Sequence, residues 1–512
     1  MRTSKLISLF CLFLSSATLL AQTYKPPVFT DPDRIKKIEA TFPVIDKIYK
    51  EYAEQNHFPG LSYGIVVDGK LVHTGSVGYT DLANKTVVTS KSAFRVASMS
   101  KSFTAMAILK LRDEGKLKLD DPAYLYIPEM KGTKYLTKDA APITIRNLLT
   151  HSAGYPEDNP WGDRQLANTD QQLIDIYKKG VQFSTNPGSG YEYSNLGFAT
   201  LGYIIKKVSG KSYEEYITEN ILKPLGMTHT YWEYTKVPKE LLAHGYRWLD
   251  NQWVEQPLLH DGSYGAMGGM ITTMEDFAKY EALHLSVWPA SDDAEKGPVK
   301  RSSIREMQYP WDVNGFNVNG KTAAGRPYPF ASAYCYGLRW RKYVDGITAV
   351  GHTGGLPGFG SEWTIYQELG IGVISFANLT YANAGSVNLQ VADTLIRLSG
   401  IKPRQLPPSA ILTQRRNELV KLLPDWNNAK ASGIFAMNFF MDYFPDKLKA
   451  DATAIYAKAG KITSVGEVVP DNQLRGYFIM QGEQSNVRVS FTLTPENQAL
   501  IQEYHIGFVE KK

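Results

Sequence analysis

Strand-like segments occur near the start of the chain and again much later, and a mostly helical stretch separates the two groups. Alternating apolar and polar residues at 61–66 and 70–78, joined by the turn Asp68-Gly69, predict a β-hairpin. The later strands are predicted at residues 336–340, 347–350, 362–367 and 370–378. This order predicts the α/β class in the α+β sense, with a sheet and a separate helical region.

The stretch between the two groups has the spacing of apolar residues that predicts amphipathic helices. In the segment 98–114 the apolar residues fall on one stripe, and Gly115 ends the helix. A helix at 33–55, broken near Pro43, precedes the first strands. Further helices are predicted at residues 145–150, 196–208, 213–222, 273–285 and 384–398.

A Pro-rich segment at residues 402–408 predicts a linker between two domains. Beyond it, helical patterns at 414–423 and 446–459 precede four strand-like runs. The chain has 512 residues, of which 43% are apolar and 21% charged, so it has the composition of a folded protein and the length of several domains. We expect a first domain over residues 30–400 and a C-terminal α+β accessory domain over residues 401–512.

The first residues show the three regions of a secretory signal peptide. Arg2 and Lys5 precede an apolar run over residues 6–20, and Ala21 is the expected last residue before cleavage. Polar residues interrupt this run, and it is shorter than a bilayer span requires. We therefore expect residues 1–21 to be a signal peptide and the mature protein to be periplasmic or secreted, in a bacterium, without a membrane span.

Charge and cysteine content limit the partners and the chemistry. The net charge is +5, and the 56 Lys and Arg are spread among 51 Asp and Glu, so no nucleic-acid partner is expected. Once Cys11 leaves with the signal peptide, Cys335 remains alone and no intrachain disulfide can form. The nine His show no spacing typical of a metal site, and neither a metal nor another cofactor is expected. The sequence leaves the oligomeric state open.

Ser98-Met99-Ser100-Lys101 stands at the start of a predicted helix. Residues three apart lie on one helix face, so the lysine amine can reach the serine hydroxyl. Serine needs a base at neutral pH, and a desolvated lysine can lose its proton and act as that base. A second match at residues 399–402 contains Gly400 and precedes Pro403, which forbid the helix that this chemistry needs.

Tyr193-Ser194-Asn195 lies in a predicted loop just before a helix. The phenol of Tyr193 can hold or pass a proton if nearby cations lower its pKa, and the amide of Asn195 can bond a substrate carbonyl. The structural alternative is a cap and an aromatic staple for the helix at Leu196. The same spacing recurs at residues 381–383, so spacing alone does not decide between the two interpretations.

His352-Thr353-Gly354-Gly355 follows a predicted strand. Glycines with free N–H groups beside a strand can form half of an oxyanion hole, and the N–H of the nucleophile can form the other half. The tripeptide recurs at residues 73–75 in the first hairpin, where a turn is a sufficient explanation.

Two further motif matches fail on their context. Residues 315–322 fit the phosphate-loop pattern but lack the strand before it and the helix after it, so nucleotide binding is not expected. Residues 60–64 fit the nucleophile elbow, but a strand and an Asp-Gly turn follow, so Ser62 is interpreted as a strand residue.

The order Ser98-x-x-Lys101, Tyr193-x-Asn195, His352-Thr353-Gly354 resembles the three-motif set of class C β-lactamases and related penicillin-recognising serine hydrolases. The resemblance covers residues 30–400 and includes linking segments at 119–122, 143–154, 201–205, 223–227 and 268–273. It implies one sheet built from the first hairpin and the late strands, with the nucleophile helix where the sheet meets the helical region. The tail loosely resembles small α+β accessory domains.

The resemblance also implies an exported serine hydrolase that forms a covalent acyl-enzyme with a small-molecule or peptide substrate: an ester, an amide, a D-amino-acid peptide or a β-lactam. Ser98 would be the nucleophile and Lys101 with Tyr193 the proton-handling pair. The substrate-binding residues would be Asn195, His352, Thr353, Gly354 and Gly355, and His151 would be a turn residue.

One departure from the family pattern bears on the activity. Class C β-lactamases usually carry Lys where this chain has His352, and the His form is more typical of esterase-, peptidase- and amidase-like relatives. Strong β-lactamase activity is therefore not expected. The alternative function is a non-catalytic penicillin-binding or sensor module with negligible turnover.

Overall fold

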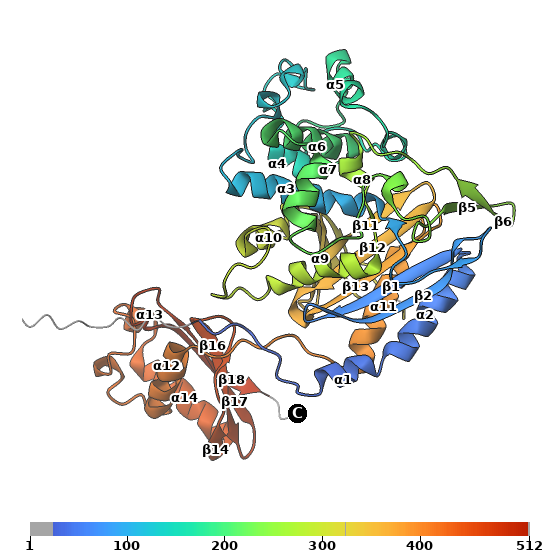
Figure 1. Ribbon diagram of the computed structural model, residues 1–512. Coiled ribbons are helices and arrows are strands. Elements are labelled where there is room, and N and C mark those ends of the chain that lie inside the picture. The colour runs from blue at the N-terminus through green and yellow to red at the C-terminus, as the bar shows by residue number, and fades with distance from the viewer. Residues whose placement is uncertain (1–23, 323, 510–512) are drawn as a thin grey trace, which may run out of the picture. The chain divides into compact units, whose positions relative to one another are not determined.

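The computed structural model describes residues 24–322 and 324–509. The predicted signal peptide, residues 1–21, lies outside the described residues. The described residues form two compact units, one over residues 29–404 and the other over residues 405–509 together with 24–28 (Figure 1).

Among the described residues, a nine-stranded antiparallel sheet forms the centre of the unit over residues 29–404 (Figure 1). The first hairpin pairs directly with the late strands, because β1 lies beside β13 with Leu61 opposite Ala377. In spatial order the strands are β3 (Thr86–Val87), β2 (Lys70–Asp81), β1 (Gly60–Val67), β13 (Ile371–Ala377), β12 (Phe359–Tyr366), β11 (Thr348–Leu356), β10 (Arg339–Tyr343), β9 (Phe330–Tyr334) and β8 (Asp312–Asn317). The predicted α+β class is confirmed.

Two of the late strands differ from the prediction. The predicted strand at 336–340 is a turn followed by β10, since Gly337 has a φ of +66°. The predicted strand at 347–350 is longer: β11 continues to Leu356 and contains the whole His352–Gly355 motif. Glycine weakens a strand pattern in a sequence, so the motif was expected to follow the strand instead of lying within it.

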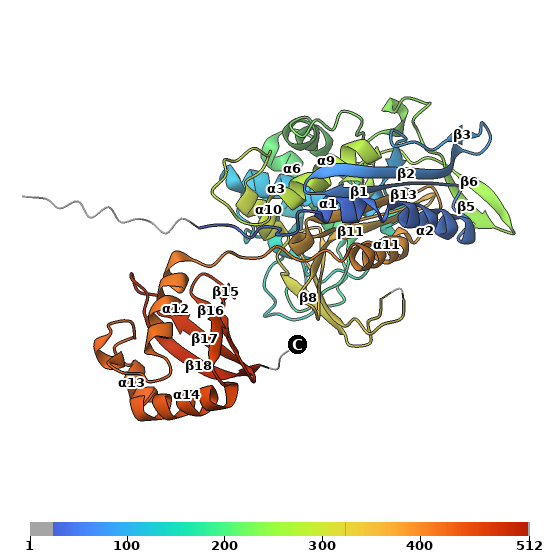
Figure 2. The same cartoon turned by 90° about the horizontal axis from the view of Figure 1, so that it is seen from below.

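Helices cover both faces of this sheet, which is why β1 is buried along its whole length. Leu61, Tyr63 and Ile65 belong to the core beneath α2 (Phe42–Gln55) and α11 (Ala384–Ser399). The intervening Val66 belongs to the core on the other face, where α9 (Met274–Ser286) packs. Figures 1 and 2 show the sheet between these layers.

The helical region lies beyond α9 and carries two of the three predicted motifs, at residues 98–101 and 193–195. Its elements are the 3₁₀ turn η1 (Ala97–Met99), α3 (Ser100–Asp113), α4 (Ile145–Leu149), α5 (Asp170–Lys179), α6 (Asn195–Ser209), α7 (Tyr213–Ile217), α8 (Gly265–Gly268) and α10 (Arg301–Met307). The predicted helix at 33–55 is α1 (Arg34–Glu39) followed by α2. Pro43 stands in the first turn of α2, where a missing N–H costs nothing.

The C-terminal unit has a sheet and a core of its own. Its described sheet has five strands, one more than the sequence pattern indicates: β14 (Ile462–Val465), β15 (Val469–Pro470), β16 (Arg475–Gly482), β17 (Asn486–Leu493) and β18 (Ile501–Val509). Its helices are α12 (Ala410–Leu422), α13 (Phe439–Asp442) and α14 (Pro445–Ala459). Leu412, Phe478 and Ile501 are among the buried residues of this core.

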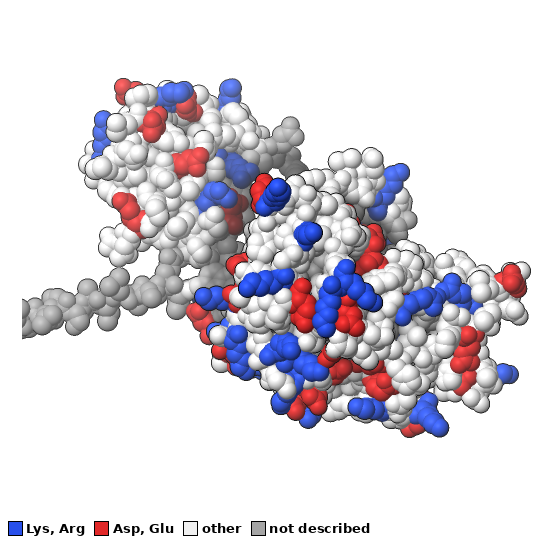
Figure 3. Space-filling model, turned by 90° about the horizontal axis from the view of Figure 1, so that it is seen from above, with Lys and Arg blue, Asp and Glu red and all other residues white. Residues whose placement is uncertain are grey.

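Basic and acidic side chains are interspersed over the face of the molecule in Figure 3. Within the described part of the chain, no helix has both the length and the apolar character needed to cross a membrane.

Candidate active site

Ser98 and Lys101 meet at the junction of η1 and α3. Ser98 belongs to η1, which follows Val96, and the preceding Ala97 has a φ of +49° that few non-glycine residues adopt. Lys101 is fully buried in the first turn of α3. Its Nζ lies 2.9 Å from the Oγ of Ser98, which is the contact that the spacing in the sequence predicts.

Lys101 is held by neutral acceptors. Its Nζ also donates to the Oδ1 of Asn195 at 2.8 Å and to the carbonyl of Met267 at 2.9 Å. Burial lowers the pKa of Lys101 to about 7, while the charges of Asp163 and Asp158 oppose that shift. A substantial fraction of the amine is therefore neutral at neutral pH and can accept a proton from Ser98.

Tyr193 lies on the other side of Ser98. Its ring centroid is 4.9 Å from the Nζ of Lys101, and its hydroxyl is hydrogen-bonded to Ser98. Burial raises the pKa of Tyr193 above its ordinary value and outweighs the opposing effects of the Ser98 hydrogen bond and the Arg339 charge. The condition stated from the sequence, a net lowering of the pKa by cations, is therefore not met: Arg339 lowers the pKa of Tyr193, but burial outweighs it and the phenol stays protonated.

The segment 193–195 has both a structural and a site role. Ser194 is the N-cap of α6, with its Oγ accepting from the N–H of Gly197 at 3.2 Å. The backbone N–H of Asn195 donates to Oδ1 of Asp158 at 2.6 Å. The side chain of Asn195 accepts from Lys101 and donates to Asn159 at 2.7 Å. The capping interpretation thus holds for Ser194, while the Asn195 amide holds the Nζ of Lys101.

His352 is a buried, neutral imidazole on β11. Its Nδ1 donates to the carbonyl of Thr353 at 2.5 Å, so its Nε2 accepts from the hydroxyl of Tyr334 at 2.9 Å. Burial, with the charges of Arg339 and Lys101, lowers the pKa of His352 well below its usual value. His352 therefore brings no positive charge to the site at neutral pH.

Gly354 lets β11 lie against η1, the turn that contains Ser98. A Cβ on Gly354 would come within 2.2 Å of the Val96 carbonyl, whereas one on Gly355 would come within 2.9 Å of the Tyr381 ring. The backbone at Gly354 thus runs beside η1, where an oxyanion hole would have to form. Thr353, the other predicted binding residue, points to the opposite face and lines a groove with Arg339.

His151 has the left-handed backbone expected of a turn residue, with a φ of +57°. Its ring also packs on two tyrosines: the ring centroids of His151 and Tyr193 are 4.2 Å apart, and those of His151 and Tyr334 are 4.4 Å apart. Its Nδ1 accepts from the N–H of Ser194 at 3.0 Å. His151 therefore helps to position Tyr193.

Three charged groups at the site were not found from the sequence: Asp158, described above, Asp163 and Arg339. Asp163 is 2% exposed, accepts from the hydroxyl of Tyr381 at 3.1 Å, and has a second oxygen without a partner. Arg339, on β10, is exposed and lies 6.0 Å from the centroid of the Tyr193 ring. None of the three belongs to a sequence motif. Pairing of β10 with β11 brings Arg339 to the site, and the course of the loop around residue 163 brings Asp163 there; neither arrangement is encoded by the local sequence.

This fold and this Ser-Lys-Tyr arrangement define a serine-hydrolase class. The Beta-lactamase family model matches residues 45–396, and the chain belongs to this family, whose members are generally serine hydrolases. The resemblance stated from the motifs is confirmed.

Two relatives and one solved structure illustrate the family. "Protein flp" of Staphylococcus aureus (strain N315) is 31% identical over 337 residues, which are 65% of this chain and 62% of that protein's length. "Beta-lactamase-like protein 2" of Dictyostelium discoideum is 27% identical over 420 residues, 78% of this chain and 71% of that one. The octameric penicillin-binding protein homologue from Pyrococcus abyssi has the same fold, with a TM-score of 0.57 at 24% identity, covering 93% of this chain and 96% of that chain.

Proposed function

We propose that the protein is a serine hydrolase that works through a covalent acyl-enzyme on Ser98. The observation that carries the proposal is the 2.9 Å contact between the Oγ of Ser98 and the Nζ of the buried Lys101. Neutral Lys101 takes the hydroxyl proton as Oγ attacks the substrate carbonyl. Protonated Tyr193 gives its proton to the departing group as the acyl bond to that group breaks, and charged Lys101 then reprotonates Tyr193. In deacylation Lys101 takes a proton from the attacking water, the acyl C–O bond to Ser98 breaks, and Lys101 returns the proton to Oγ of Ser98.

Arg339 supports a substrate whose leaving group carries a carboxylate. It is exposed beside Tyr193, and among the described residues it forms no ion pair with a carboxylate. Because His352 is neutral, Arg339 is the group that can supply positive charge to an anionic leaving group here. Peptides with a free C-terminal carboxylate, such as D-amino-acid peptides, fit this better than simple esters do.

The same proposal includes export. The charged and apolar regions before Ala21 support a periplasmic or secreted location. N-terminal sequencing of the exported protein should begin at or near Gln22; an exported protein that begins at Met1 would contradict cleavage.

The first experiment is covalent labelling. Treatment with a fluorophosphonate or a penicillin should give one adduct by intact mass spectrometry, and peptide mapping should place it on Ser98. Ser98→Ala should not be labelled, whereas Ser62→Ala, which removes the serine of the rejected elbow motif, should be labelled like the unchanged protein. Labelling that survives in Ser98→Ala would overturn the assignment.

A turnover assay then separates the enzyme from the binding module. An N-acylated D-alanyl-D-alanine peptide should be hydrolysed, with loss of activity in Ser98→Ala. A Ser98 adduct without measurable turnover of peptides, amides or esters would favour a penicillin-binding sensor instead.

A further inference from the structure

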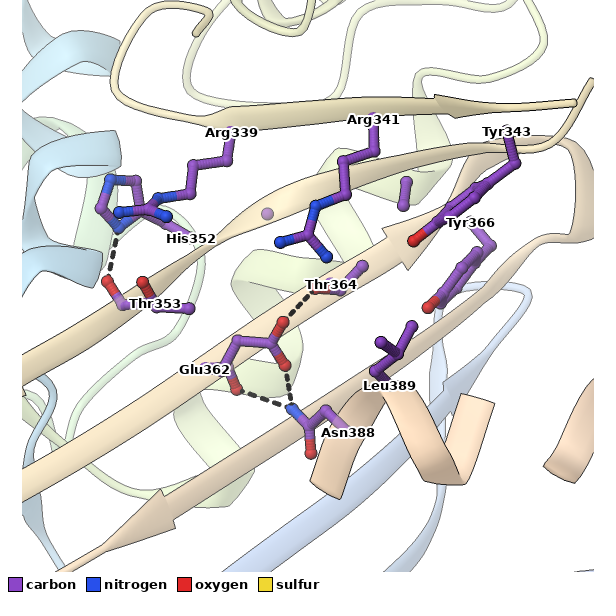
Figure 4. A pocket seen from close by; sticks show the side chains of 12 residues that line it. Arg339, Arg341, Tyr343, His352, Thr353, Glu362, Thr364, Tyr366, Asn388 and Leu389 are labelled. Carbon is purple, nitrogen blue, oxygen red and sulfur yellow. Dashed lines mark hydrogen bonds between the residues drawn. The ribbon is translucent and has the colours of Figure 1, made fainter. Parts of the chain in front are cut away.

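A polar groove runs along the sheet face that α11 covers (Figure 4). Its floor is β11, where Ala349 and Gly351 leave space because their side chains are small or absent. Arg339 and Arg341 of β10 form one wall, and Glu362 of β12 lies across from them (Figure 4). The enclosed part of the groove is about 30 Å³, and the rest of the roughly 440 Å³ of space along it includes open solvent.

The groove lies on the α11 side of the sheet and adjoins the Ser98 site through His352 and Arg339. His352 and Thr353 line it, and both belong to the motif strand. Arg339 connects the two regions, because it lines the groove and also lies beside Tyr193. A substrate bound at Ser98 with its carboxylate near Arg339 would therefore extend toward Arg341.

The side chains on the two walls give the groove a net positive charge. Within the described part of the chain, neither Arg339 nor Arg341 forms an ion pair. Arg341 hydrogen-bonds to Tyr343 and lies 5.2 Å from the Phe330 ring centroid. Two guanidinium groups face one carboxyl, so the charge is positive whether Glu362 is ionised or not.

Glu362 is held in place by neutral donors. It accepts from the hydroxyl of Thr364 at 2.7 Å and from the amide of Asn388. Burial raises the pKa of Glu362 to about 7, against the charges of Arg341 and Arg339. The other titratable groups around it are His352 of β11, Tyr343 of β10, Tyr366 of β12 and Tyr49 of α2, which donates to Asn388. The buried Glu281 of α9, on the other face of the sheet, interacts with it electrostatically.

We propose that this groove is the leaving-group subsite and that it selects a leaving amino acid with an acidic side chain. The inference rests on the proposed acyl-enzyme function and names the substrate class of that same site. Arg339 binds the α-carboxylate of the leaving residue, and Arg341 binds its side-chain carboxylate. The scissile amide C–N bond breaks as Ser98 is acylated, and the amine nitrogen departs with a proton.

The test measures how well free amino acids, as analogues of the leaving group, protect Ser98. D-Glutamate and D-glutamine differ in charge but hardly in shape, so each is added while a fluorescent penicillin acylates Ser98. D-Glutamate should protect at a concentration about tenfold lower than D-glutamine, the effect of one charge-assisted contact. The same ratio should appear in kcat/KM for N-acyl-D-alanyl peptides that end in these two residues.

Substitutions identify the groove as the source of that preference. Arg341→Gln should bring the ratio close to one, and Arg341→Lys should keep part of it. The matched control is Arg397→Gln, which removes an exposed arginine of α11 outside the groove lining and should leave the ratio unchanged. A thermal melt of each variant shows that it is folded.

The pH dependence of protection tests whether Glu362 acts through its charge or only supports the structure of the groove. Ionisation of Glu362 above about pH 7 should weaken protection by D-glutamate, and Glu362→Gln should remove that pH dependence. Equal protection by the two amino acids, or a preference that Arg341→Gln retains, would overturn the subsite while Ser98 labelling still supports the hydrolase. Absence of Ser98 labelling would instead overturn the proposed function.

Discussion

At the scale of the residue, burial sets the chemistry of Lys101. An ordinary lysine is almost fully charged at neutral pH, whereas burial lowers the pKa of Lys101 to about 7 and its hydrogen bonds aim it at Ser98. Tyr193 is shifted in the opposite sense by the same burial, so it stays protonated. One desolvated pocket therefore makes one group a base and keeps its neighbour an acid.

The first prediction is that Ser98 acylation depends on the ionisation of Lys101. Only the neutral amine accepts a proton, so the rate should rise about tenfold per pH unit below 7 and level off above it. Asp163→Asn removes a negative charge that favours charged Lys101, so it should move this profile to lower pH. The measurement is the rate of Ser98 acylation by a fluorescent penicillin as a function of pH. The same pH profile in Asp163→Asn and in the unchanged protein would contradict the effect of the Asp163 charge on the pKa of Lys101.

The second prediction is that Lys101 and Tyr193 act as one unit. The proton that Lys101 takes from Ser98 restores Tyr193 after Tyr193 has protonated the departing group, so the two groups form one relay. Lys101→Ala and Tyr193→Phe should therefore each slow acylation by about 10²- to 10⁴-fold or more, and the double variant should be little slower than either. A double-mutant cycle on acylation rates, with a thermal melt of each variant, measures the coupling. If the losses simply multiply, or if Tyr193→Phe is nearly neutral, the shared-proton mechanism is wrong.

At the scale of the element, the site depends on how closely β11 approaches η1. Val96 contacts β11 through its carbonyl, which also accepts from the hydroxyl of Ser361 on β12 at 2.8 Å. Gly354 stands where any side chain would meet that carbonyl. The glycine is therefore required by contact with a distant segment.

The third prediction follows from that contact. Gly354→Ala should destabilise the protein by about 1–3 kcal/mol through overpacking and lower the acylation rate by moving η1. The control is Gly197→Ala in α6, where the added Cβ would meet other atoms no closer than 3.8 Å. Denaturant unfolding and acylation rates measure both effects. Unchanged stability and acylation in Gly354→Ala would show that β11 can move away from Val96 without loss of folding free energy, which would contradict the prediction.

At the scale of the whole molecule, the predicted catalytic and binding residues lie in the unit over residues 29–404. That unit has large cores on both faces of its sheet, and the C-terminal unit has a separate core that includes Phe478 and Ile501. Each unit thus has the apolar interior that independent folding requires.

The fourth prediction is that the C-terminal unit is dispensable for the chemistry. A shortened chain that ends at Arg404 should melt cooperatively and hydrolyse the same small peptide at a comparable rate, because it keeps Ser98, Lys101 and β11. Calorimetry and turnover assays test it. A shortened protein that is folded but inactive would mean that the C-terminal unit completes the site.

The local part of this structure could be predicted from the sequence. The hairpin, α3 and α6 follow from residue periodicity, and the helical spacing alone placed Lys101 within reach of Ser98. A cap for the helix at Leu196 was one of the two interpretations of residues 193–195, and the structure assigns that cap to Ser194, a residue type favoured where a helix begins. The order of the three motifs also gave the family, because such an order rarely arises by chance.

Only the tertiary structure decided what distant segments do to one another. The pairing of β1 with β13, the full length of β11 and the position of Arg339 depend on contacts far apart in the chain. The pKa of Tyr193 could not be read from its neighbours in sequence, because desolvation comes from every element packed around the ring. Local periodicity is encoded residue by residue, whereas burial and strand pairing are properties of the folded whole.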